Sequence, residues 1–92
     1  MSPVSALAVP RLHAKARLQR DDVRGRDVLL YPEGLVALNA TGVEILALCD
    51  GERSLADIVH TLQERYGTAG LAADIGAFLD GLAAKGLVTY GP

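Results

Sequence analysis

The spacing of apolar positions along the chain changes once, close to residue 40. Before this point apolar residues alternate with polar ones or form short runs, a pattern typical of β-strands. After it they recur every three or four residues, which is typical of amphipathic helices. The order of the two regions predicts an α+β domain in which strands come first and helices follow.

Three short strands are predicted in the first part. Residues 12–19 alternate loosely, and residues 28–31 and 35–38 are two apolar runs. Between these runs lies Pro32-Glu33-Gly34, and proline and glycine are residues that favour a tight turn. The second and third strands are therefore predicted to form a hairpin.

Three helices are predicted in the second part, over residues of about 42–49, 55–66 and 70–85. Thr41 and Glu44 match a capping box for the first helix, and Ser54 and Asp57 match one for the second. Gly51, Gly67 and Gly86 follow the three helices, as expected of residues that end them. Residues 87–90 are interpreted as a last short strand or an extended tail.

The predicted fold class is thus α+β and similar to a winged helix-turn-helix, with a small antiparallel sheet (β-β-β) followed by three helices. Residues 1–10 contain two prolines and are interpreted as a flexible N-terminal tail. Residues 21–27 are interpreted as a charged connector. Residues 11–90 are expected to form one domain, because 92 residues suffice for a single core.

Charge argues against nucleic acid as a partner. The formal net charge is −2, and the basic residues near the N-terminus are interleaved with Asp21, Asp22 and Asp27. In a winged helix the third helix enters the major groove, but here it carries Asp74 and Asp80. Phosphate binding requires Lys and Arg, so a nucleic-acid-binding regulator is kept only as an alternative.

No catalytic or metal-binding constellation is visible in the sequence. His13 and His60 have no second ligand at metal spacing, and Cys49 is predicted to face the core at the end of a helix. We therefore expect neither an enzyme nor a bound metal or cofactor. A single cysteine and the absence of a run of about 20 apolar residues predict a cytoplasmic protein that does not span a membrane.

Peptide recognition is the function that these observations leave. An exposed strand edge carries unpaired N–H and C=O groups, to which an extended peptide can add as another strand. Residues 35–38 form the candidate strand. The third helix is rich in alanine and glycine. These small residues favour either close approach of another chain or tight packing within the domain, and the sequence leaves both readings open.

Several motifs together resemble the PqqD family of pyrroloquinoline quinone (PQQ) biosynthesis, over the stretch from Pro10 to Val88. They are Leu29-Leu30-Tyr31-Pro32-Glu33-Gly34, Leu38-Asn39, Ile45-Leu46-x-Leu48 with Asp50-Gly51, Ile58-Val59-x-x-Leu62, and Asp74-Ile75-x-x-Phe78-Leu79-x-x-Leu82. The first of these motifs is the most specific, because the helical patterns alone occur in many proteins.

The resemblance implies a non-catalytic peptide chaperone. Such proteins bind the precursor peptide PqqA and present it to the radical S-adenosylmethionine enzyme PqqE, with the peptide added to the third strand beside the third helix. Carried over residue by residue, this implies a peptide site formed by Leu35, Val36, Ala37, Leu38, Leu71, Ile75, Phe78 and Leu79. A small quinone carrier remains an alternative, and a monomer or a weak, strand-exchanged homodimer is expected.

Overall fold

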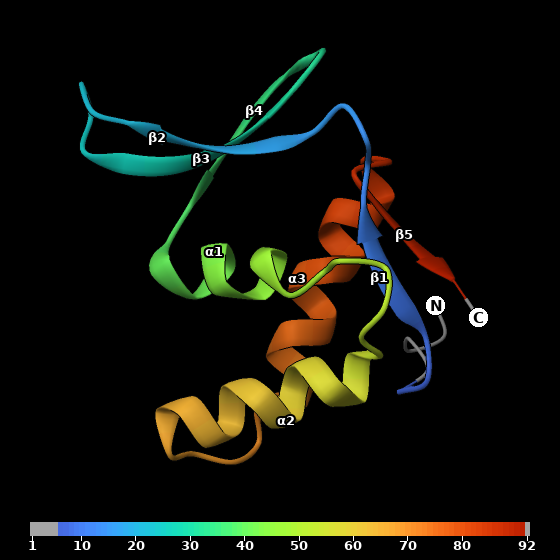
Figure 1. The fold of residues 1–92 in the computed structure, drawn as a ribbon. Coiled ribbons are helices and arrows are strands. Elements are labelled where there is room, and N and C mark those ends of the chain that lie inside the picture. Colours follow the sequence, from blue (N-terminus) through green and yellow to red (C-terminus); the bar gives the residue numbers. More distant parts are fainter. Residues whose placement is uncertain (1–5, 92) are drawn as a thin grey trace.

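The computed structural model describes residues 6–91 (Figure 1). The elements in chain order are β1 (Val9–Leu12), β2 (Arg17–Asp21), β3 (Arg26–Tyr31), β4 (Gly34–Leu38), α1 (Ala40–Ala47), α2 (Leu55–Tyr66), α3 (Ala72–Ala84) and β5 (Val88–Gly91). Strands precede helices except for the last strand, so the predicted α+β class is confirmed.

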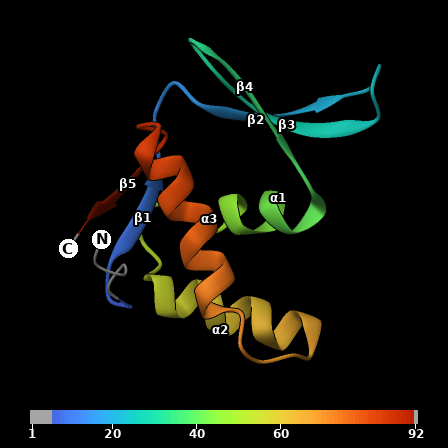
Figure 2. The ribbon, with the colours of Figure 1, turned by 180° about the vertical axis from the view of Figure 1, so that it is seen from behind.

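Strands β2, β3 and β4 form a three-stranded antiparallel sheet with β3 in the centre. The predicted hairpin is present: Tyr31 pairs with Gly34 around the two-residue turn at Pro32 and Glu33. Figures 1 and 2 both show this sheet extending away from the helices, with β4 leading directly into α1. Leu29 in β3 is fully buried and ties the sheet to the core.

The predicted strand over residues 12–19 is wrong, because a turn divides it. The N–H of Ala16 donates to the carbonyl of His13 at 3.0 Å, so β1 ends at Leu12 and β2 begins at Arg17. β1 pairs with β5 in a separate two-stranded sheet. The loose alternation of apolar and polar residues therefore runs across the turn between β1 and β2. The turn becomes evident only because β1 pairs with the distant strand β5.

The predicted connector and tail also differ from the structure. β2 reaches Asp21 and β3 starts at Arg26, so the charged turn is confined to residues 22–25. Residues 6–10 are attached to the domain: the carbonyls of Ala6 and Ala8 accept hydrogen bonds from the N–H groups of Ala56 and Leu55, at 2.9 and 2.8 Å. Residues 1–5 lie outside the described part of the chain.

The first helix starts earlier than predicted. Asn39, rather than Thr41, is its N-cap, and the Asn39 side-chain oxygen accepts from the N–H of Gly42 at 2.8 Å. Asparagine is as good a cap as threonine or better, so the capping box predicted for Thr41 and Glu44 does not form. The Glu44 carboxylate instead forms an ion pair with the Arg65 guanidinium of α2, which donates a hydrogen bond to it at 2.9 Å.

The second and third helices follow the prediction closely. Ser54 and Asp57 form the predicted capping box, and Gly67 ends α2 in the left-handed conformation with φ of 64°. Helix α3 runs from Ala72 to Ala84, within the predicted limits. Its inner face packs on α1, α2 and both sheets through a core that includes Leu29, Ile58, Leu62 and Leu79. Burial of these aliphatic side chains holds the small domain together.

Candidate functional site

Strand β4 is an edge strand of the three-stranded sheet. Its backbone pairs with β3 on one side and, among residues 6–91, with no strand on the other. Antiparallel pairs alternate between those that exchange backbone hydrogen bonds and those that do not. Because Tyr31 and Gly34 close the hairpin, this alternation directs the N–H and C=O groups of Leu35 and Ala37 toward the open edge.

The side chains of β4 divide between the core and the outer face. Leu38 is buried and Val36 is half-buried against the core, whereas Leu35 is 48% exposed and Ala37 is exposed. This division follows from the period of two in a strand. A strand added to β4 therefore finds two apolar residues on each face of the sheet, with Leu35 and Ala37 on the exposed face.

The four helix residues predicted for the site are divided in the same way. Ile75 and Leu79 are only 2% and 0% exposed, so they belong to the core. Leu71 and Phe78 are half-buried. A β-carbon on Gly42 would lie 3.3 Å from the Phe78 ring, which places this ring beside the start of α1, immediately after β4. Of the four helix residues, Phe78 and Leu71 are thus the two that are not fully buried.

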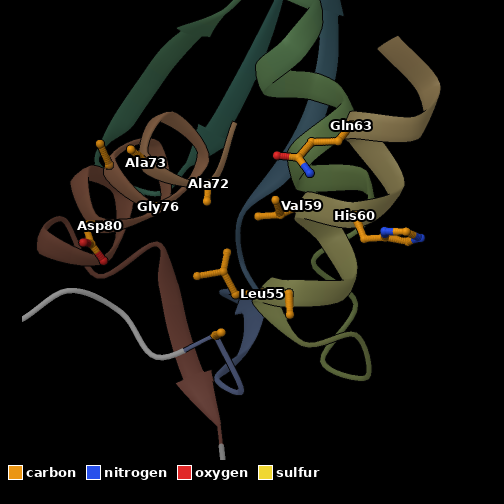
Figure 3. A pocket seen from close by; sticks show the side chains of 11 residues that line it. Leu55, Val59, His60, Gln63, Ala72, Ala73, Gly76 and Asp80 are labelled. Atoms are coloured by element: carbon orange, nitrogen blue, oxygen red, sulfur yellow. The ribbon is translucent and has the colours of Figure 1, made fainter. Parts of the chain in front are cut away.

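A groove between α2 and α3 was not predicted as a site from the sequence. Its volume is about 660 Å³, which falls within the range of natural binding pockets. It is lined by Ala6, Leu55, Ala56, Val59, His60, Gln63, Ala72, Ala73, Gly76, Ala77 and Asp80. Figure 3 shows Leu55 and Val59 directed into the space between the two helices. The only sequence signal for it was the run of small residues on the third helix.

Two kinds of chemical site concern the titratable groups: a metal site and an activated nucleophile. No group of three or more His, Cys, Asp or Glu side chains within residues 6–91 is placed to hold a metal ion. Cys49 is buried, and its Sγ donates to the carbonyl of Ile45 at 3.3 Å. Burial, and to a smaller degree the Asp50 carboxylate, raises the pKa of the Cys49 thiol to about 12. A thiol held in its neutral form is a poor nucleophile.

This raised pKa leads to a testable pH dependence. The unfolded chain loses the thiol proton near the ordinary pKa of 9.0, before the folded chain does at about 12. The stabilising contribution is fully present below about pH 9, and we expect it to decline between these two values. Urea unfolding at about pH 8 and pH 10 measures the loss of stability. A Cys49→Ala variant should lose less between the two conditions, and an unchanged loss would contradict the assignment.

Tyr90 must be considered in the same experiment. Its hydroxyl donates to the Asp80 carboxylate at 2.7 Å. Burial, followed by this hydrogen bond, raises the pKa of the Tyr90 phenol. Part of the decline at alkaline pH is therefore expected to remain in the Cys49→Ala variant.

Comparison with known sequences identifies the family. The sequence profile described as "Coenzyme PQQ synthesis protein D (PqqD)" matches residues 27–88. The chain belongs to the PqqD family. A "PqqA binding protein" of Rhodopseudomonas palustris (strain HaA2) is 44% identical over 88 residues, which cover 94% of this chain and 86% of that protein. One of Pseudomonas aeruginosa (strain UCBPP-PA14) is 46% identical over 81 residues, covering 87% and 88%.

A solved structure of a PqqD protein has the same fold. It is the solution NMR structure of the PqqD part of PqqCD from Methylobacterium extorquens, described as a functional and stand-alone recognition element for ribosomally synthesised and post-translationally modified peptides. The match has a TM-score of 0.78 and 38% identity, and it covers 92% of this chain and 93% of that one. The resemblance inferred from the motifs is confirmed, and these relatives are described as binding proteins and as a recognition element rather than as catalysts.

One further expectation concerns the membrane. Within the described residues, every helix is too short or too polar to cross a lipid bilayer.

Proposed function

We propose that this PqqD protein binds the precursor peptide PqqA along β4 and presents it to the radical S-adenosylmethionine enzyme PqqE. The single observation that carries the proposal is the open edge of β4. The half-buried Phe78 of α3, which lies beside Gly42 shortly after this strand ends, is proposed to extend the site. Relatives over 40% identical along most of the chain are named PqqA binding proteins, which supports PqqA as the peptide. The peptide-binding domain proposed is residues 11–90.

In this proposal the peptide forms a fourth strand of the sheet. The outward backbone groups of Leu35 and Ala37 would provide its hydrogen bonds, and each bond contributes about 1 kcal/mol net. A micromolar dissociation constant corresponds to about 8 kcal/mol. The few backbone bonds are therefore too weak alone, and apolar contacts with Leu71 and Phe78 must supply a large share of the affinity.

Of the eight residues expected to form the site, we retain five as direct contacts: Leu35, Val36, Ala37, Leu71 and Phe78. The other three would act indirectly, because they are buried and hold β4 and α3 in position through the core: Leu38, Ile75 and Leu79. A short bound segment leaves the rest of the peptide free, so that the modifying enzyme could reach residues outside the bound stretch. This is the sense in which the peptide is presented.

The open edge of β4 also bears on the oligomeric state. Two copies could pair weakly through β4, and a peptide that adds to β4 would compete with this contact. We therefore propose a monomer in the peptide complex and a weak, strand-exchanged homodimer at most without it. We also propose that the protein acts in the cytoplasm, where the free thiol of Cys49 stays reduced.

A titration tests the proposed function. Isotope-labelled protein is titrated with synthetic PqqA, and the backbone amides are followed by NMR. We expect the largest shift changes at residues 34–38 and around Leu71 and Phe78. A scrambled PqqA peptide is the control. If these residues show no shift change at high micromolar PqqA, the β4 site is ruled out.

A further inference from the structure

We propose that the groove between α2 and α3 is a second docking surface, which takes a cationic amphipathic helix of the peptide-modifying enzyme. This inference rests on the proposed function, because a carrier that delivers a peptide must contact the enzyme while its peptide site is occupied. It names the surface of this protein that makes the contact and the kind of helix that the surface would bind. Three observations support it: the position of the groove on α3, its apolar lining and the charge around it.

The groove and the proposed peptide site lie on opposite sides of α3. In an α-helix successive residues are rotated by about 100°, so Gly76 and Phe78 point roughly 160° apart. Gly76 lines the groove with α2, whereas the Phe78 ring lies beside Gly42 of α1. A peptide on β4 and a helix in the groove can therefore bind at the same time, with the rigid helix α3 between them.

The shape of the groove suits a helix. Leu55 and Val59 of α2 point into it (Figure 3), and its lining on α3 consists of three alanines, Gly76 and Asp80. A β-carbon at Gly76 would meet no heavy atom within 4 Å, so this lining is open to another side chain. Small residues allow close approach of a helix, and an apolar groove receives the apolar face of an amphipathic one.

Charge specifies the polar face of the docked helix. One carboxylate, that of Asp80, lines the groove. Three more, those of Asp57, Glu64 and Asp74, lie elsewhere on α2 and α3, against the single guanidinium of Arg65. Arg65 is already paired with Glu44 at 2.9 Å. Neither lysine nor arginine occurs among the described residues that line the groove. Lys or Arg flanking the apolar face of the incoming helix would thus be electrostatically complementary.

Two glycines of α3 offer a matched pair of variants. Gly76 lines the groove and Gly81 does not, but a β-carbon at either one meets nothing within 4 Å. Gly76→Leu and Gly81→Leu therefore add the same side chain to the same helix, with room for its β-carbon at both positions. We measure the affinity of each for purified PqqE by isothermal titration, and the affinity for synthetic PqqA separately.

The expected result separates the two surfaces. Gly76→Leu should weaken PqqE binding about tenfold or more. Its affinity for PqqA should stay within about twofold of that of the unmodified protein. Gly81→Leu should keep its PqqE affinity within about twofold of the unmodified value. Unchanged PqqE affinity in Gly76→Leu would overturn the docking surface, as would a parallel loss of PqqA affinity. Failure of the unmodified protein to bind PqqA would instead overturn the proposed function, whatever the PqqE result.

A second pair of variants tests the charge. Ala73 is exposed and lines the groove, so it tolerates a long side chain. Ala73→Arg should weaken PqqE binding by several times more than Ala73→Glu does, because only the arginine repels a cationic helix. Equal effects of the two variants would contradict the cationic partner. If Gly76→Leu sediments differently from the unmodified protein in the absence of PqqE, the groove is a contact between copies of this chain. This result would also overturn the proposal.

Discussion

Replacing Leu79 with alanine is expected to lower the free energy of unfolding by about 2–5 kcal/mol. The Leu79 side chain is fully buried within the core between the helices and the sheet, and its removal leaves a cavity that rigid neighbours fill only in part. Domains of this size are stable by only about 5–15 kcal/mol. Urea unfolding followed by circular dichroism would measure the change.

Leu71→Ala is the matched control, because it makes the same change on the accessible side near the start of the same helix. Leu71 is half-buried, so this variant should lose less stability. It should weaken PqqA binding more than its loss of stability explains, since Leu71 is proposed to contact the peptide. If Leu79→Ala retained its stability and lost peptide affinity instead, the assignment of Leu79 to the core would be wrong.

Replacing Ala37 with proline is expected to reduce PqqA affinity at least about tenfold while the domain stays folded. Proline removes one N–H that is proposed to donate to the peptide, and its ring would crowd the incoming strand. Edge strands tolerate proline where the N–H faces away from the sheet, which is the direction that the register assigns to Ala37. Isothermal titration with PqqA measures the affinity, and circular dichroism checks the fold.

The opposite edge of the sheet provides the control. Leu18 lies in β2, at the other edge, and pairs with Leu29 of the central strand. The hydrogen-bond alternation directs its N–H outward as well. Leu18→Pro should therefore resemble Ala37→Pro in stability but bind PqqA like the unmodified chain. Equal losses of affinity in the two variants would show that the peptide does not select the β4 edge.

Local chemistry explains which elements could be predicted from the sequence. The turn at Pro32-Glu33-Gly34 and the capping box of Ser54 and Asp57 are both present as expected. Each depends on residues within three or four positions of one another. The first helix shows the limit of such reasoning, because Asn39 and Thr41 are both good caps and neighbouring residues did not decide between them.

Long-range pairing explains what could not be predicted. β1 finds its partner in β5, with Val9 opposite Gly91, and nothing in the alternation near residue 12 points to a strand so distant in the sequence. The segment before β1 is likewise held by distant residues, because Ala6 and Ala8 accept backbone hydrogen bonds from the start of α2. The division of the expected site residues into core and accessible groups has the same origin, since burial depends on which elements pack on each face.

The sequence by itself determined the family, the α+β class and the hairpin that makes β4. Motifs and turn residues can be identified from residues that are close together in the sequence. It also placed an apolar strand and an apolar helix as candidates for recognition. Only the tertiary structure decided that Leu79 belongs to the core, that Phe78 lies beside Gly42 of α1, and that α3 has a second open face toward α2. The periodicity of a helix gives the angles between its residues, but the packing of its neighbours decides which of those directions meet protein and which remain free for a partner.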